Sequence, residues 1–157
     1  MKLTSEVIEG FSKLILAKTF DDYKATPECH KEWWNACTSN YPLVAIAAPR
    51  AHGKSTAITH CYTLAAALFR ERRYIVVVSD TYEQAVLFVQ DMKKELVNNQ
   101  DLIDLFKIEA LEKEAENDLI VRLKGGWRFR ITAKGAEQKM RGMKWDNMRP
   151  DLILCDD

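Results

Sequence analysis

The residues best suited to chemistry form the run Gly53-Lys54-Ser55-Thr56. A phosphate-binding loop needs inward-turned backbone N–H groups, a helix N-terminus with its partial positive charge, a lysine that reaches phosphate oxygens, and a hydroxyl for magnesium. The glycine, the lysine and the serine supply these parts in that order. The run follows a continuous apolar stretch at Leu43–Ala48, typical of a buried parallel strand, and precedes a helical pattern that extends to about Phe69.

This context predicts a nucleotide-binding loop that uses ATP and Mg²⁺. The residues expected to contact the nucleotide are Pro49, Arg50, Ala51, His52, Gly53, Lys54, Ser55 and Thr56. The alternative interpretation, without a nucleotide, is a helix that begins near Gly53 with Ser55 and Thr56 in its first turn. The first glycine of the usual phosphate-loop pattern is missing, because position 48 is alanine.

A second group of candidate residues is the pair Asp156-Asp157, which follows the apolar stretch Leu152–Cys155. Nucleotide hydrolases place one such carboxylate in the magnesium shell and a second where it orients or deprotonates water. We expect Asp156, together with Ser55, to hold the metal, and Asp157 to act on the water. Two aspartates after a strand are also common in simple turns.

The elements that must position these groups alternate between helix and strand. Helices are expected over residues 5–18, 30–37, 54–69, 82–99 and 102–106, and strands over 43–48, 74–78, 119–123, 127–131 and 152–155. This order predicts an α/β fold of the RecA-like (ASCE) P-loop NTPase class. It would have three layers: a mostly parallel central sheet with helices on both faces, and a basic β-hairpin turning at Gly125-Gly126. The sheet is expected to be incomplete at its C-terminal side.

The composition is that of one globular domain: 157 residues, 23 Lys and Arg, 23 Asp and Glu, and 47% hydrophobic residues. We divide residues 1–157 into a helical segment, 1–40, and a nucleotide-binding core, 41–157. No apolar run approaches the roughly 18 residues of a membrane helix. Four cysteines without a Cys-x-x-Cys spacing favour neither a disulfide framework nor a zinc site.

The charge distribution is uneven along the chain, because residues 122–149 hold nine bases and two acids. This asymmetry indicates either an anionic partner or a solvated basic face. The bases expected on the polar face of the hairpin are Arg122, Lys124, Arg128 and Arg130. Such a surface suits contact with DNA phosphates without base reading.

Four motifs together resemble the ATPase domain of a tailed-bacteriophage terminase large subunit. They are Arg50–Thr56, Ser79–Ala85, Gln138–Gly142 and Asp151–Asp157. The phosphate loop of that family commonly deviates from the usual pattern and carries a basic residue four positions before the lysine, which Arg50 matches. The resemblance covers about residues 28–157.

The resemblance implies a motor that hydrolyses ATP to drive double-stranded DNA into a procapsid. It implies a homo-oligomeric ring docked on the portal protein, aided by a small terminase subunit, in the cytoplasm of a bacterial host; a monomer in isolation is compatible with it. Asp157 occupies the position usually held by the catalytic glutamate. Arg50 is a candidate sensor of the γ-phosphate, and Arg141 a candidate arginine finger for a neighbour's ATP. His30 and Trp33 lie where related motors contact adenine.

The chain lacks the family's nuclease motifs, so we expect no DNA cleavage. Two alternatives to a packaging motor stay open. Ser79-Asp80-Thr81, followed by Gln84-Ala85, also resembles the second motif of helicase cores, which would make the chain a helicase-like NTPase. A nucleotide-binding assembly module that does not hydrolyse ATP is the other.

Overall fold

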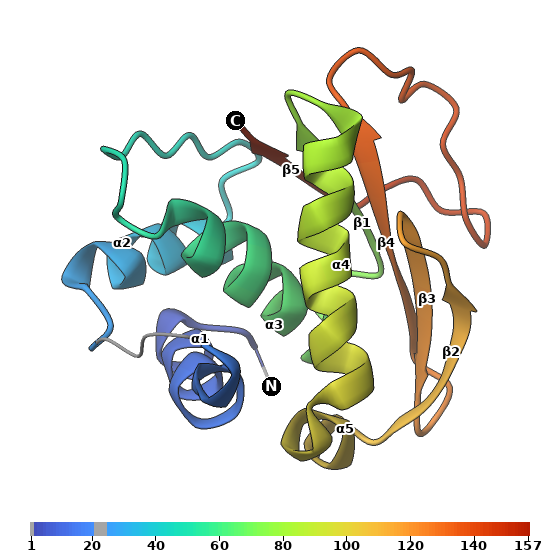
Figure 1. The fold of residues 1–157 in the computed structure, drawn as a ribbon, viewed down its shortest axis with the longest axis horizontal. Coiled ribbons are helices and arrows are strands. Elements are labelled where there is room, and N and C mark those ends of the chain that lie inside the picture. Colours follow the sequence, from blue (N-terminus) through green and yellow to red (C-terminus); the bar gives the residue numbers. More distant parts are fainter. Residues whose placement is uncertain (1, 21–24) are drawn as a thin grey trace.

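The computed structural model describes residues 2–20 and 25–157 of the chain. Helices gather on one side of a single five-stranded sheet (Figure 1). The α-helices are α1 (Ser5–Phe11), α2 (Glu28–Thr38), α3 (Thr63–Leu68), α4 (Tyr82–Asn98) and α5 (Gln100–Phe106). Three further helical segments are η1 (Ser12–Leu16) and η3 (Ser55–Tyr62), which are π-helical, and η2 (Ala17–Thr19), which is a 3₁₀ turn.

The sheet has the strand order β2-β3-β4-β1-β5. Its strands are β1 (Tyr74–Ser79), β2 (Ile108–Glu114), β3 (Asp118–Leu123), β4 (Arg128–Gly135) and β5 (Leu152–Asp156). Strand β1 pairs in parallel with β4 and β5, whereas β3 pairs antiparallel with β2 and β4. Half of the strand pairs are therefore antiparallel.

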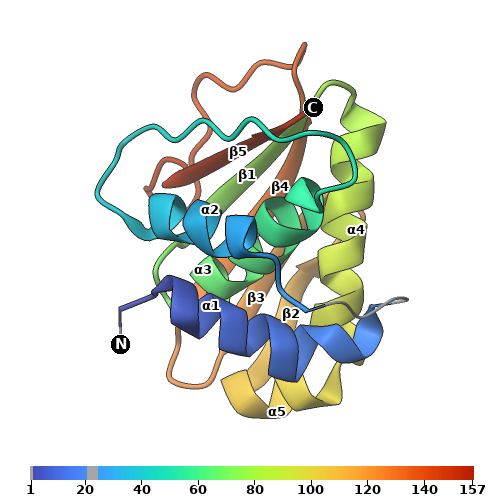
Figure 2. The ribbon, with the colours of Figure 1, turned by 90° about the vertical axis from the view of Figure 1, so that its left-hand side faces the viewer.

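This architecture confirms the α/β class but shows that the expected P-loop NTPase fold is wrong. The sheet is mixed rather than mostly parallel, because β2, β3 and β4 form an antiparallel meander that occupies more than half of it. The helices cover one face only, so there are two layers and not three (Figures 1 and 2). The opposite face is covered in part by the long connection between β4 and β5, from which Trp145 packs on Tyr74.

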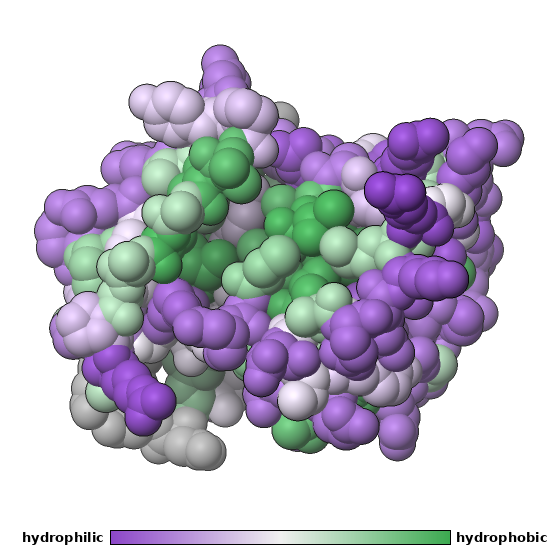
Figure 3. Space-filling model, turned by 90° about the horizontal axis from the view of Figure 1, so that it is seen from above, coloured by the Kyte–Doolittle hydropathy of each residue, from purple (hydrophilic) through white to green (hydrophobic). Residues whose placement is uncertain are grey.

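The segment 43–48 is the second correction, because it forms no strand. It has no regular secondary structure and passes β5 on its way to η3 (Figures 1 and 2), and Leu43 is 86% exposed. Strand β5 is the outermost strand of this sheet, so residues 43–48 do not pair with its outer edge, where a further parallel strand would lie. Hydrophobic surface lies across the middle of this end of the molecule, framed by polar side chains (Figure 3).

The other predicted elements form close to their expected bounds for local reasons. The side chain of Thr81 caps α4 by accepting a hydrogen bond from the Gln84 N–H at 3.2 Å. The turn between β3 and β4 contains Gly125 and Gly126, both with positive φ. The expected helix 54–69 forms as η3 followed by α3.

The main core lies between the helices and the sheet. It includes Phe11, Trp34, Leu64, Val89 and Ile131. A smaller cluster on the opposite sheet face joins Tyr74, Val76 and Val78 to Trp145. The strand β1 is thus buried on both faces, as its uninterrupted apolar sequence indicates.

Within the described residues, no helix is both long and apolar enough to cross a membrane.

Candidate functional site

The backbone of the loop before η3 favours glycine at position 53. Gly53 has φ +69°, and the ring of His30 lies 3.3 Å from the position that a Cβ atom would take. A larger residue would therefore meet both backbone strain and the imidazole. Ala51 is also left-handed, with φ +66°. Two left-handed residues two positions apart turn the chain sharply just before η3 begins.

An ion pair joins this loop to the second candidate group. The Lys54 Nζ lies 2.7 Å from a carboxylate oxygen of Asp157, 103 residues away in the sequence. The hydrogen bond to Asp157 raises the pKa of Lys54. The same bond lowers the pKa of Asp157, and the positive charge of Arg50 adds to this effect. Both groups are therefore held in their charged forms.

The neighbouring aspartate is anchored from the helical side. The Thr59 hydroxyl donates a hydrogen bond to Asp156 Oδ2 at 2.6 Å, inside the protein. Asp156 is 5% exposed, and its second oxygen, Oδ1, is buried without a hydrogen-bond partner. A buried carboxylate oxygen without a donor is unfavourable, and magnesium prefers oxygen ligands of this kind. Asp156 therefore fits the metal-binding role expected of it.

Aromatic side chains of α2 contact the loop and the helix η3 that follows it. The His30 Nε2 lies 2.7 Å from the carbonyl oxygen of His52, and its ring centroid is 5.0 Å from that of Trp33. The Trp34 indole N–H donates to the Ala57 carbonyl at 2.8 Å. The structure thus places His30 and Trp33 beside the loop, and their predicted contact with adenine stays a prediction.

The two candidate arginines lie in different places. Arg50 is in the loop itself, close enough to Asp157 to affect its pKa. Arg141 lies in the connection between β4 and β5, where it lines a cavity of about 500 Å³ with Arg149 and Ile153. This cavity is on the sheet face that the helices leave uncovered, because Val76 also lines it. Arg141 is therefore not part of the loop site of its own chain.

The basic residues of the hairpin are largely neutralised by acids. Arg130 donates two hydrogen bonds to Asp118, at 2.8 and 2.7 Å. Arg128 contacts Glu112 and Asp146, and Arg122 lies 3.4 Å from Glu109. Among the described residues, Lys124 of the hairpin and the bases of the β4–β5 connection form no ion pair. Those bases are Lys139, Arg141, Lys144 and Arg149.

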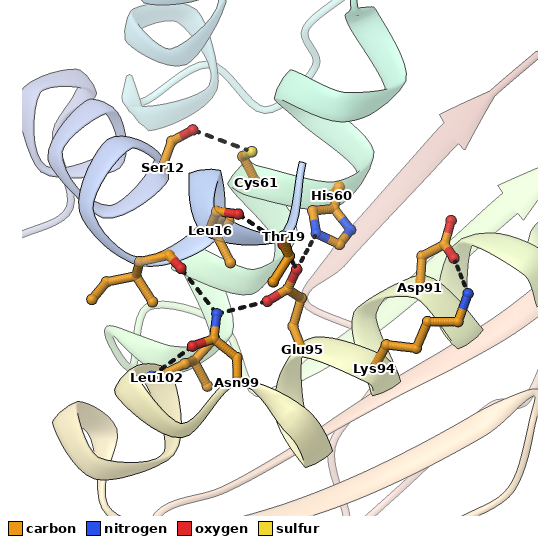
Figure 4. A network of polar contacts seen from close by, with 11 residues as sticks. Ser12, Leu16, Thr19, His60, Cys61, Asp91, Lys94, Glu95, Asn99 and Leu102 are labelled. Carbon is orange, nitrogen blue, oxygen red and sulfur yellow. Dashed lines mark hydrogen bonds and ion pairs between the residues drawn. The ribbon is translucent and has the colours of Figure 1, made fainter. Parts of the chain in front are cut away.

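A cavity of about 730 Å³ lies beside the loop, between η3, α4 and the segment that ends at Phe20. Ser55 and Thr56 line one part of it, and Glu95 lines another. Figure 4 shows the polar contacts of Glu95 with Thr19, His60 and Asn99. Burial alone would raise the pKa of Glu95, but the His60 imidazole 3.8 Å away and the hydrogen bonds from Thr19 and Asn99 outweigh it and lower the pKa. The carboxylate is thereby kept ionised within the protein.

Sequence reasoning missed Thr59 and Glu95, for which the signals are weak. Thr59 lies on η3 one turn beyond Ser55, and it does not stand out there because Ser55, Thr56 and His60 are also polar. Glu95 interrupts the apolar stripe of α4 that includes Val89. Neither signal identifies a partner, because the contacts of Thr59 with Asp156 and of Glu95 with Thr19 join segments that are 97 and 76 residues apart.

Comparison with protein-family models, with curated proteins and with solved structures finds no match for this chain. The resemblance to the terminase family therefore rests on the four motifs described above.

Proposed function

We propose that the chain binds ATP at the loop 49–56 and hydrolyses it with Mg²⁺. The observation that carries the proposal is the 2.7 Å ion pair between Lys54 and Asp157. It brings together the two groups that the sequence assigns to phosphate binding and to water activation. The ion pair forms although residues 43–48 are not the strand that the sequence predicts before the loop.

In this proposal the ion pair is exchanged when nucleotide binds. The Lys54 ammonium moves from Asp157 to phosphate oxygens, for which a charged donor is well suited. Asp157, whose side chain is 90% exposed, is then free to accept a proton from a water molecule. The oxygen of that water attacks the γ-phosphorus, the bond from phosphorus to the bridging oxygen breaks, and ADP leaves. Ser55 and Asp156 would hold Mg²⁺, which neutralises phosphate charge when bound.

The motor role is proposed from the resemblance alone. In it, ATP turnover drives double-stranded DNA, and the protein acts as a ring with a portal protein and a small terminase subunit in a bacterial cytoplasm. The position of Arg141 outside the loop site of its own chain is compatible with donation to a neighbouring subunit. An arginine donated in this way typically raises the rate by roughly 10³-fold or more.

The test is calorimetric titration of Mg-ATP into the wild type, Lys54→Ala and Lys18→Ala. Lys18 is the matched control, because it also forms an exposed ion pair with an aspartate, Asp101. A charged hydrogen bond contributes about 1.5–3 kcal/mol, so affinity should fall roughly 10- to 150-fold in Lys54→Ala and stay unchanged in Lys18→Ala. Equal affinity in all three proteins would contradict the site. Binding without turnover would favour a non-hydrolysing assembly module.

A further inference from the structure

The ends of β1 and β5 place two buried polar side chains next to each other. Ser79 and Asp156 are register partners on these parallel strands. They are 2% and 5% exposed, respectively. Both lie on the helical face of the sheet, because Val77 and Leu154, two residues earlier on each strand, belong to the core beneath the helices.

Both side chains have an atom without a partner. In the described residues only four buried side-chain nitrogen or oxygen atoms lack a hydrogen bond, and two of them are Ser79 Oγ and Asp156 Oδ1. Each such atom is unfavourable unless something binds it, because it has given up its hydration without gaining a partner. Their position on adjacent strands makes a single polar ligand the simplest way to satisfy both.

The Thr59 hydroxyl determines which oxygen of Asp156 is left without a hydrogen bond. It donates to Asp156 Oδ2 at 2.6 Å, which leaves Oδ1 as the free oxygen. Thr59 lies on η3, the helix that begins with Ser55 directly after the candidate phosphate loop. One helix therefore carries both the hydroxyl expected to bind the metal and the hydroxyl that orients the metal-binding carboxylate.

The donor set indicates the class of ligand. A carboxylate oxygen and a hydroxyl oxygen are hard ligands, which suit Mg²⁺ or Mn²⁺ rather than a soft metal. Within the described residues, no group of three or more His, Cys, Asp or Glu side chains is arranged to hold a metal. A cation at this place therefore needs further oxygens from outside the chain, and nucleotide phosphates are such a source.

We infer that Ser79 is an additional oxygen ligand of the cation held by Asp156, and that Thr59 is the positioning residue of that carboxylate. The inference deepens the proposed function and rests on it. It assigns to the end of β1 a role that the phosphate loop and the paired aspartates do not cover. With Ser79 as a ligand, strand β1 contributes to the metal site together with its neighbour β5.

The experiment measures Mn²⁺ binding by electron paramagnetic resonance in the presence of ADP, so it needs no turnover. The variants are Ser79→Ala, Thr59→Val and Thr59→Ser. The matched control is Thr132→Val, because Thr132 also donates a buried hydrogen bond to an aspartate, Asp118, at 2.9 Å. Removing an outer partner of a metal ligand typically lowers metal affinity roughly 10- to 100-fold.

We expect Mn²⁺ affinity to fall at least roughly tenfold in Ser79→Ala and Thr59→Val, and to stay near the wild-type value in Thr59→Ser and Thr132→Val. Wild-type affinity in Ser79→Ala and Thr59→Val would overturn the inference while the proposed function stands. A wild type that binds no ADP or ATP would overturn the proposed function itself. Ser79→Ala removes an unpartnered hydroxyl and should fold, so the test does not depend on the stability of Thr59→Val.

Discussion

Two ion pairs in this protein have the same length and opposite environments. Lys54 and Asp157 approach to 2.7 Å at the surface, where the Asp157 side chain is 90% exposed. Arg130 and Asp118 approach to the same distance, but the Asp118 side chain is 6% exposed. Lys113 and Thr132 also donate to Asp118, so its carboxylate accepts four hydrogen bonds.

The difference separates a pair that can exchange partners from one that cannot. Water readily replaces either member of the exposed pair, so a phosphate can displace Asp157 from Lys54 at little cost. Breaking the buried pair would strand a charge inside the protein. Burial alone would raise the pKa of Asp118, yet the hydrogen bonds from Arg130, Lys113 and Thr132 lower it. In the proposed function the first pair would take part in ATP hydrolysis, whereas the second pair stabilises the fold.

The largest effect is expected from Asp157→Asn on ATP hydrolysis. The amide cannot accept the proton of the attacking water, so the rate should fall by about 10²- to 10⁴-fold. Nucleotide affinity and the thermal unfolding midpoint should stay unchanged, because the exposed pair contributes little to stability. Turnover at the wild-type rate would show that another residue activates the water.

Asp118→Asn should lower the free energy of unfolding by about 3–5 kcal/mol, because the Arg130 guanidinium loses its buried counter-ion. Chemical denaturation monitored by circular dichroism measures this. Glu112→Gln is the matched control: its carboxylate also pairs with an arginine, Arg128, but nearer to solvent, and should cost about 1 kcal/mol or less. Equal losses would remove the distinction between the two kinds of pair.

DNA binding extends the comparison to the basic residues. We expect Lys139→Gln with Arg141→Gln to reduce the slope of log affinity against log salt by about 1.8, or roughly 0.9 for each phosphate that is no longer neutralised. Arg130→Gln should change this slope less, because Arg130 is already paired with Asp118. Filter binding to two unrelated duplexes measures both effects. A larger change in Arg130→Gln would assign the DNA interaction to the hairpin instead.

The smallest expected effect is on how the free energy of unfolding depends on pH in the acidic range. The pKa of Asp118 and that of Glu95 are both lowered in the folded protein. Their contribution is therefore fully present above the unfolded values, near about pH 4, and is lost as the pH falls through the folded values. Glu95→Gln should make the unfolding free energy less steep below about pH 4, by at most about 1.4 kcal/mol per pH unit. An unchanged slope would show that Glu95 titrates alike in both states.

Elements with local signals could be predicted from the sequence. Strand β1 is an unbroken apolar run, α4 begins at the Thr81 cap, and the hairpin turns at Gly125-Gly126. The sequence does not predict strand β2, because its glutamates hide the alternation of a strand. Two of those glutamates, Glu109 and Glu112, pair with arginines of the hairpin, which only the folded chain reveals.

The remaining errors concern long-range pairing. The apolar run 43–48 has strand-like composition, but composition does not say whether a neighbouring strand is present on each edge. The alternation of helix and strand predicts a mostly parallel sheet, and the meander β2-β3-β4 overrides it. In the candidate site, the sequence predicts the types of Lys54, Asp156 and Asp157, whereas the anchor from Thr59 depends on tertiary contact.

The π-helical hydrogen bonding of η3 has a consequence for comparing this chain with others. In a π-helix the backbone hydrogen bond joins residues i and i+5, whereas in an α-helix it joins i and i+4. Each hydrogen-bonded turn of a π-helix therefore contains one more residue than a turn of an α-helix. A homologue whose corresponding helix is α-helical throughout should therefore align with residues 55–62 only across a one-residue gap. Without that gap, the alignment would pair Thr59 with the wrong residue of the homologue, and a hydrogen bond equivalent to that of Thr59 with Asp156 would be missed.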